Sequence, residues 1–419
     1  MLAHRLILII PLAVSAACAH PRTGAIAAAG AGAQPAPEEG CLLSTGPVSA
    51  RAPTITIGLS DAVDPRHAPF ARNDAERIVF RHLYETPVRI DCDGHVRPEL
   101  AAQWEKVDGG RRWTFRLRDG AQFWDGAPVT AQDIVFGHGG AGYTLSAPEK
   151  GVVTVTFAKE RDDVPPVLGD PGLAVTKPAP DSSWPIGTGA YWATSGTTTA
   201  QEIRAHTPRG DTLVFKFAAS GDARDLLDAG VDLLVTRDRA LRDYAATLQN
   251  HEVAALPWDR TYVFVTGDAG GTGFDAGGLE QAVHADARRP EGDFWWRDLR
   301  ACGIARDTAP PAPTSKRILY ARADQTGREL AGRLAALTHA VAAGRAPDEF
   351  SAALAAGKDW GYVIALPRVT VDACRSARDL LPSWPAGFTA LVDTRPTAIV
   401  RRGVARWTVD QDGTVHLAP

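Results

Sequence analysis

The sequence predicts an α/β protein large enough for two or three domains. Strand-like and helix-like segments alternate along the chain, a pattern typical of mixed sheets with flanking helices. The chain has 419 residues, whereas domains commonly run to about 100 to 200 residues. Apolar residues make up 45% and charged residues 22%, as in folded soluble proteins. The net charge of −4 provides no basic field for nucleic acid.

Side-chain periodicity marks the individual elements. Apolar side chains that alternate with polar ones indicate strands, and the expected strands are 54–59, 112–118, 152–158, 212–218 and 261–267. Apolar side chains at helical spacing predict helices at 75–85, 222–230, 279–289, 327–344 and 348–357, several of which end in Gly as C-caps prefer. Asp74 is expected to cap the first helix.

The first 18 residues have the pattern of a signal peptide. His4 and Arg5 precede the apolar run LILIIPLAVSAA, which is too short to span a bilayer and suits an export signal. Cys18 is the candidate lipid-accepting residue of a lipoprotein, and plain cleavage near Ala17 or Ala19 is the alternative. Residues 19–51 are rich in Ala, Gly and Pro and predict a flexible linker. The chain is therefore expected in the periplasm or on the outer face of the cytoplasmic membrane.

The remaining cysteines fit an oxidising compartment. They fall into an early pair, Cys41 and Cys92, and a late pair, Cys302 and Cys374. Pairing within each group is the preferred of three connectivities. The sequence has no Cys-x-x-Cys, which disfavours a zinc ribbon or a thiol redox site.

The stretch RDGAQFWDGAPVTAQDIVF, residues 118–136, predicts a tight turn followed by a helix start. Thr130 is placed to cap the helix, and Asp133 stands three residues later, where a capping-box acid reaches back to free amides. Val129 and Ile134 occupy the positions of a hydrophobic staple. These groups are predicted to have structural roles and no catalytic one.

Residues 83–136, of which that stretch is the end, resemble the signature region of the bacterial extracellular solute-binding proteins of family 5. These are the receptors of oligopeptide, dipeptide and nickel ABC transporters. The matching residues are Tyr84, Glu85, Pro98, Leu100, Ala101, Trp104, Trp113, Phe115, Leu117, Arg118, Asp125, Gly126, Thr130, Ala131 and Asp133. Downstream, PIGTGAYW at 185–192 resembles the family's Pro-x-Gly-Thr-Gly-Pro-Tyr, with Ala190 in place of Pro.

The resemblance implies a two-lobed fold of the periplasmic binding protein type II kind, cluster C, with a hinge between the lobes. The first lobe is expected to comprise 52–268 and 394–419, and the second 269–393. It further implies an ABC importer's binding protein, a monomer that captures a small solute between the lobes and presents it to a permease. The alternative is a degenerate member with a partner-binding or structural role at the envelope, whose cleft would be filled by side chains.

The candidate ligand-binding residues come from three segments. The loop DPRHAPFARNDAE resembles the family segment that lines the cleft, two aromatics follow the Gly-Thr-Gly turn, and a third group lies just before the expected hinge. The candidates are Phe70, Arg72, Asn73, Tyr191, Trp192, Trp258, Arg260 and Tyr262.

Two departures from the family pattern bear on the ligand. The segment between Phe136 and VVTVTF is short, so the chain is expected to be a shortened and divergent member. Peptide receptors of the family carry, after a segment like residues 348–366, an acid that holds the peptide's α-amine. This chain has Leu366, Pro367 and Arg368 there, and a buried ammonium needs a paired acid, which argues against free-peptide binding.

Enzyme signatures are missing from the sequence. It contains neither a Gly-x-Ser-x-Gly nucleophile elbow nor a phosphate-binding loop, and its His residues lack metal-ligand spacing. We expect a non-enzyme without a cofactor or bound metal.

Overall fold

The computed structural model describes residues 41–43, 54–135, 143–162, 166–218, 221–266, 301–302, 316–367 and 388–418. The chain divides into Met1–Gln34 and Pro35–Pro419, and all of the described residues belong to the second unit. The expected helix 279–289, Cys18 and Cys374 lie outside the described residues. The described helices are α1 (Asp74–Leu83), α2 (Ala131–Val135), α3 (Arg224–Asp228), α4 (Arg239–Ala245), α6 (Gln325–Thr338) and α7 (Pro347–Ala356).

The first six-stranded sheet combines segments from both ends of the chain. Its strands in spatial order are β12 (His251–Ala255), β19 (Thr397–Arg401), β11 (Leu233–Thr236), β2 (Thr54–Leu59), β10 (Thr212–Phe217) and β9 (Glu202–His206). β2 is parallel to both β10 and β11, and the outer pairs are antiparallel. Alternate residues of β11 enter different cores: Leu233 and Val235 pack with α1, and Leu234 packs with α3 and α4. Both faces of this sheet are therefore buried.

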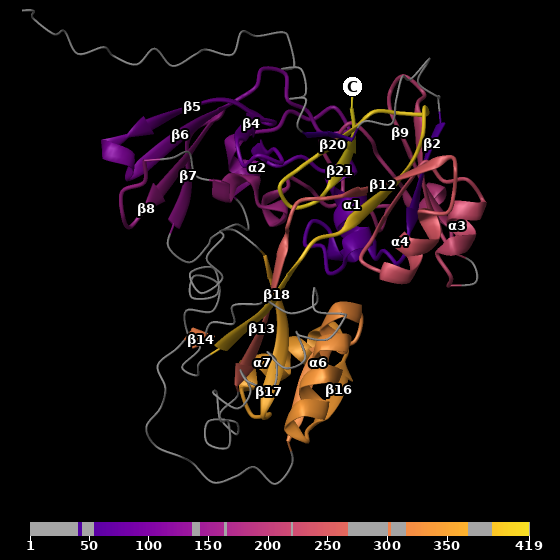
Figure 1. Cartoon of the computed structure of the whole chain (residues 1–419). Helices are drawn as coiled ribbons and strands as arrows, with labels where there is room; N and C mark the ends of the chain where they lie inside the picture. Colours follow the sequence, from indigo (N-terminus) through magenta and orange to yellow (C-terminus); the bar gives the residue numbers. More distant parts are fainter. Residues whose placement is uncertain are drawn as a thin grey trace, which may run out of the picture. The chain divides into compact units, whose positions relative to one another are not determined.

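The second six-stranded sheet is also buried on both faces. Its spatial order is β14 (Ala301–Cys302), β18 (Phe388–Thr394), β13 (Arg260–Thr266), β17 (Gly361–Pro367), β15 (Arg317–Ala321) and β16 (Val341–Arg345). Tyr262 and Phe264 of β13 share a core with α6, whereas Val263 and Val265 share one with α7. Figure 1 shows α6 and α7 beside these strands.

Three smaller sheets complete the described fold. One has four antiparallel strands in the order β5 (Ala101–Val107), β6 (Arg112–Leu117), β8 (Val152–Phe157) and β7 (Tyr143–Glu149). A second pairs β3 (Val88–Ile90) with β4 (Val96–Pro98), and a third has β1 (Leu42–Leu43), β20 (Trp407–Val409) and β21 (Val415–Leu417). Within the described ranges no helix is long and apolar enough to cross a membrane.

Most element predictions are confirmed, and two are wrong in detail. The helix expected at 327–344 ends at Thr338, because His339 takes a left-handed conformation and Val341–Arg345 pairs in parallel with β15. Sheet pairing thus overrides the helical preference of the Ala-rich segment. The cap of α1 is Asn73 and not Asp74, which occupies the first helical position. The α/β prediction itself is confirmed.

The predicted reach of Asp133 back to a free amide after the Asp-Gly turn is confirmed. The Thr130 amide and hydroxyl both donate to Asp133 Oδ2 at 2.7 Å, at the start of α2. Val129 and Ile134 are buried in the same core.

Candidate functional site

A cavity of about 1630 Å³, here called the main cavity, is lined by residues from the ends of both six-stranded sheets. Asp61 follows β2, Arg237 follows β11 and Asp324 follows β15, each just beyond the carboxyl end of a strand with a parallel neighbour. Such ends are where open α/β sheets bind ligands. The start of α1 and the segment before β13 also contribute to its wall.

Local capping positions the α1 part of the wall. The Asn73 side chain accepts a hydrogen bond from the Glu76 amide at 2.8 Å and donates to the Ala62 carbonyl at 2.9 Å. It thereby starts the helix and ties it to the preceding loop. Asp74 and Arg77, one turn apart, consequently both reach the main cavity.

Two aspartates and three arginines form a connected ion-pair network in this wall. Arg237 donates to Asp74 at 2.7 Å and to Asp259 through two nitrogens, the shorter contact being 2.5 Å. Arg77 contacts Asp74 at 3.0 Å and Asp259 at 3.2 Å, and Arg260 donates to Asp74. The Asp259 side chain is only 1% exposed. The network joins α1 and β11 to the strand β13 of the second sheet.

The network has three arginines and two aspartates, and these opposite charges shift the pKa values of its members. Burial alone would raise the pKa of Asp74, but Arg260, Arg237 and Arg77 together hold it well below its ordinary value. Burial would lower the pKa of Arg237, and Asp74 and Asp259 raise it instead. Asp74 and Arg237 are therefore both charged at neutral pH.

Asp61 and Asp324 are among the acids of the main cavity that form no ion pair with a described residue. No described residue donates a hydrogen bond to the Asp61 carboxylate or forms an ion pair with it, and the residue is half-buried. Burial and the nearby Asp74 raise the Asp61 pKa. Asp324 Oδ1 accepts the Tyr262 hydroxyl at 2.8 Å and the Gly327 amide at 2.9 Å, as the cap of α6.

The structure places the predicted site residues in three different settings. Arg72, Asn73 and Arg260 line the main cavity. Arg72 also pairs with Asp348 of α7 at 2.8 Å. Tyr262 is fully buried and reaches the site only through its hydroxyl on Asp324.

The other predicted residues lie outside the wall of the main cavity. Phe70 is 59% exposed, and Trp258 is 43% exposed with the Arg395 guanidinium 4.6 Å above its ring. Tyr191 and Trp192 line a separate pocket of about 240 Å³. There the Trp192 ring stacks on Trp124 at 5.7 Å between centroids. Their ligand roles remain predictions.

Sequence reasoning missed most of the charged residues that the structure brings together. Asp61, Asp74, Arg77, Arg237, Asp259 and Asp324 were not among the candidates. One signal was available: Asp61 and Arg237 come directly after buried strands, where parallel strands deliver ligand-facing groups. Which strands are neighbours was not visible in the sequence.

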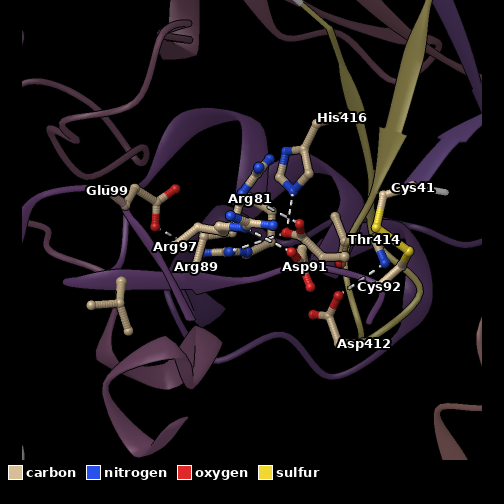
Figure 2. Close-up of polar contacts among 12 residues, drawn as sticks. Cys41, Arg81, Arg89, Asp91, Cys92, Arg97, Glu99, Asp412, Thr414 and His416 are labelled. Atoms are coloured by element: carbon tan, nitrogen blue, oxygen red, sulfur yellow. Dashed lines mark hydrogen bonds and ion pairs between the residues drawn. A yellow bond between two sulfur atoms is a disulfide. The ribbon is translucent and has the colours of Figure 1, made fainter. Parts of the chain in front are cut away.

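A second polar cluster, shown in Figure 2, fastens α1 to the C-terminal hairpin β20–β21. The buried Asp410 carboxylate accepts from His416 at 2.6 Å, and Arg81 and Arg89 lie at 3.4 and 3.5 Å from it. Burial opposes ionisation of Asp410, but His416 and both arginines lower its pKa overall. The disulfide Cys41–Cys92 joins β1 to the turn beside this cluster. Cys302 falls in β14, and its pairing with Cys374 lies outside the described residues.

Two described groups have the composition of a metal site, but one of them includes Cys41 and Cys92, whose sulfurs form a disulfide. Asp91, Asp93 and His95 have ligand atoms within 4.8 Å of one another. Asp91 already accepts from Arg97 at 2.7 Å and from the amides of Asp93 and His95. A hydrogen-bonded turn explains this arrangement, and it supports no metal assignment.

The signature residues form internal contacts. Arg118 makes a two-point pair with Glu85 at 2.9 and 2.8 Å and donates to the Glu99 carbonyl at 2.7 Å. Gly187 and Gly189 lie against the Leu83 backbone so closely that an added Cβ would stand 2.3 and 2.7 Å from its carbonyl oxygen. The two glycines of the Gly-Thr-Gly turn thus allow it to pack closely against the end of α1.

Comparison with known proteins shows which family has a similar signature region. Residues 95–206 match the family model described as "Bacterial extracellular solute-binding proteins, family 5 Middle". The probable deoxycholate-binding periplasmic protein YgiS of Escherichia coli is 48% identical over 65 residues, and the murein peptide-binding protein MppA of the same organism is 48% identical over 58. The resemblance to family 5 is confirmed. These alignments cover 16% and 14% of this chain, but only 12% and 11% of the two relatives' own lengths.

Solved structures extend the family 5 likeness to the fold. MppA of Escherichia coli aligns over 89% of this chain and 99% of its own, with a TM-score of 0.60 and 14% identity. The dipeptide binding protein from Pseudoalteromonas sp. SM9913, in complex with Met-Leu, aligns over 86% and 98%, with a TM-score of 0.61 and 11% identity. The prediction of a two-lobed periplasmic binding protein fold is confirmed. At these identities the likeness shows the fold alone.

Proposed function

We propose that this chain is the exported binding protein of an ABC-type importer. It captures a small solute in the main cavity and presents it to a membrane permease. The observation that carries the proposal is the main cavity itself, which lies at the carboxyl ends of strands from two sheets and carries nine aspartates and seven arginines on its wall. A volume of about 1630 Å³ is ample for a solute.

The proposed cellular location is taken from the names of the relatives. Several of them are named as periplasmic, and we propose the periplasm for this chain as well. The signal peptide, the lipid anchor at Cys18, the monomeric state and the lobe boundaries near 268 and 394 are parts of the same proposal. No catalysis is proposed, because the described cavity contains neither a nucleophile with an adjacent base nor a metal-ligand set.

The alternative, a degenerate envelope protein, requires a cleft filled by side chains. The open volume of the main cavity supports solute capture over that reading. A partner-binding role would also place the recognition surface outside the cavity.

Purification of the exported protein, followed by gentle unfolding and mass spectrometry of the released material, tests the proposal. Melting shifts of the refolded protein against peptides, Ni²⁺ chelates, opines and short sugars complete the experiment. We expect a defined released compound or a saturable shift of several degrees. Disruption of the gene should abolish uptake of that compound by the source cell.

A matched pair of variants tests the location. Arg77→Ala removes a side chain of the cavity wall, whereas Arg204→Ala removes one that pairs with Glu202 on β9, outside that wall. Loss of binding in the first and retention in the second would agree with the proposal. Detectable turnover of the compound, or binding unaffected by any cavity variant, would contradict it.

A further inference from the structure

A second pocket, with a volume of about 240 Å³, lies apart from the main cavity and is here called the aromatic pocket. The aromatic side chains on its wall are Tyr84, Trp124, Trp184, Tyr191 and Trp192. No described residue lines both this pocket and the main cavity. Solute capture in the main cavity therefore does not account for the aromatic pocket.

Hydrogen bonds fix the walls of the aromatic pocket. Trp124 donates twice to the Gly-Thr-Gly turn, from its amide to the Gly187 carbonyl at 3.1 Å and from its indole nitrogen to the Gly189 carbonyl at 2.9 Å. The Trp184 indole nitrogen donates to the Thr198 hydroxyl at 2.8 Å. A wall that is already ordered in this way loses little conformational entropy when a ligand binds.

Trp192 is the exposed member of this wall. Two backbone hydrogen bonds with His206, at 3.0 and 3.1 Å, hold it to β9, and its ring stacks on Trp124. Trp192 is nevertheless 41% exposed, whereas Tyr84 and Trp184 are each 1% exposed. Neither Trp124 nor Trp192 is among the residues that match the family 5 signature. A ligand that covers the Trp192 ring removes apolar surface from water, which favours binding.

The polar side chains beside the aromatic pocket are largely engaged within the protein. Asp125 is the one charged residue on its described wall, and Asp125 Oδ2 lies 2.5 Å from Lys177 Nζ while Oδ1 accepts the Ala127 amide at 3.1 Å. Ser182 Oγ accepts two backbone amides, at 3.1 and 3.2 Å. Because Lys177 neutralises Asp125, the wall provides no counter-charge for an ion. Its remaining capacity for a ligand is mainly aromatic surface.

We propose that the aromatic pocket binds a small neutral compound with a planar ring system, of the size of phenol or indole. An apolar cavity of roughly 150 Å³ holds benzene. The aromatic pocket, at about 240 Å³, therefore has room for one ring or two fused rings. A planar ring contacts the flat faces of Trp124 and Trp192 over more area than a puckered ring does. The inference goes beyond the proposed function and does not depend on it.

Ligand-observed NMR titration of the full exported chain tests the class of ligand. The probes are indole and phenol, and four other compounds serve for comparison. Cyclohexanol has a puckered ring, benzoate and benzylamine carry a charge, and N-acetylglucosamine is a sugar. We expect saturable binding of indole or phenol that is at least tenfold tighter than binding of any of the four.

Three variants, each checked for folding by circular dichroism, test the location. Trp192→Ala removes the exposed ring and should weaken binding of indole or phenol at least tenfold. Ala179→Trp adds a bulky side chain to the wall while it keeps Trp192, and it should weaken binding by a similar factor. The matched control Trp258→Ala removes a tryptophan that is 43% exposed and lies outside the pocket, and it should bind as the parent does.

The opposite results would overturn the proposal. Binding of indole or phenol that survives both Trp192→Ala and Ala179→Trp, or that Trp258→Ala weakens equally, would refute the aromatic pocket as the site. Equal or tighter binding of cyclohexanol, N-acetylglucosamine or a charged probe would refute the planar neutral class. A chain that binds no probe would refute the proposal as a whole and leave solute capture in the main cavity standing.

Discussion

Arg237 shows how single residues hold the wall of the main cavity. Its side chain is 13% exposed, and it bridges Asp74 of α1 to the buried Asp259 before β13. Removing one member of a buried ion-pair network leaves an uncompensated charge, which is worse than removing the whole network.

We therefore predict that Arg237→Ala lowers the free energy of unfolding by about 3 kcal/mol. Chemical denaturation measures the change. The control Arg204→Ala removes an arginine whose side chain is 50% exposed and should alter stability little. Equal stability of Arg237→Ala and the parent would show that Arg77 and Arg260 compensate Asp259 without Arg237.

His82 predicts an acid-sensitive step in stability. Its ring is buried among Tyr191, Phe215 and His416, and its Nδ1 bonds the Ile78 carbonyl at 2.7 Å. Burial and the neighbouring His416 lower the His82 pKa to about 3. An unfolded His titrates near ~6.5, so acid protonates the unfolded chain first.

The stability contributed by neutral His82 is present above pH ~6.5 and is lost as the pH falls towards about 3, with roughly 2 kcal/mol lost by pH 5. Denaturation of His82→Gln at pH 7 and pH 5 should show a correspondingly smaller difference than the parent. An unchanged difference would assign the acid sensitivity to other groups.

At the scale of elements, α1 depends on its cap. The Asn73 side chain accepts a hydrogen bond from the Glu76 amide and donates one to the Ala62 carbonyl. Asp74 and Arg77 of the helix line the main cavity. We predict that Asn73→Ala costs about 1 kcal/mol of stability and also weakens solute binding. Asn73→Ser keeps a capping oxygen and should retain most of both. Denaturation and titration of the two variants side by side measure this, and equal loss in both would locate the effect in the Ala62 contact.

Close packing of the Gly-Thr-Gly turn against α1 predicts that a side chain at Gly189 destabilises the fold. A Cβ at Gly189 would stand 2.6 Å from the Leu83 carbonyl carbon, so Gly189→Ala must displace the end of α1 or the turn. We expect a loss of about 1–3 kcal/mol, as for other overpacked contacts. At Gly196 the nearest atom would be 3.7 Å away, and Gly196→Ala should be tolerated. Thermal melting distinguishes the two variants, and an unaffected Gly189→Ala would remove close packing as the reason for this motif.

The predictability of each element depended on whether its determinants are local. The start of α2 was predicted because Thr130 and Asp133 are three residues apart and bond each other. The strand β16 was missed because its Ala-rich sequence favours helix, and only its pairing with the distant β15 makes it a strand. The predicted Asn73 and Arg260 do line the main cavity, yet each has an internal partner that the sequence could not reveal. Asp61 and Asp324 were missed because 263 positions separate them in the chain.

For the whole molecule, the disulfide Cys41–Cys92 closes a loop with a sequence separation of 51 residues. In the chain-entropy description, such a crosslink stabilises the fold by about 4 kcal/mol through the unfolded state. We predict a loss of this order, and a clearly lower melting temperature, in the double variant Cys41→Ser, Cys92→Ser. Calorimetry of the variant without reductant isolates this bond from the other cysteines. Parent-like melting would mean that the paired strands β1 and β20 already fix this end of the chain.

The same closed loop contains β2, Asp61 and all of α1, and hence one part of the wall of the main cavity. A protease that cuts once between Cys41 and Cys92 therefore produces two pieces that stay covalently joined until a reductant is added. A chain nicked in this region would therefore keep this part of its cavity wall attached. Electrophoresis without reductant would show such a nicked chain as intact, and electrophoresis with reductant would reveal the cut.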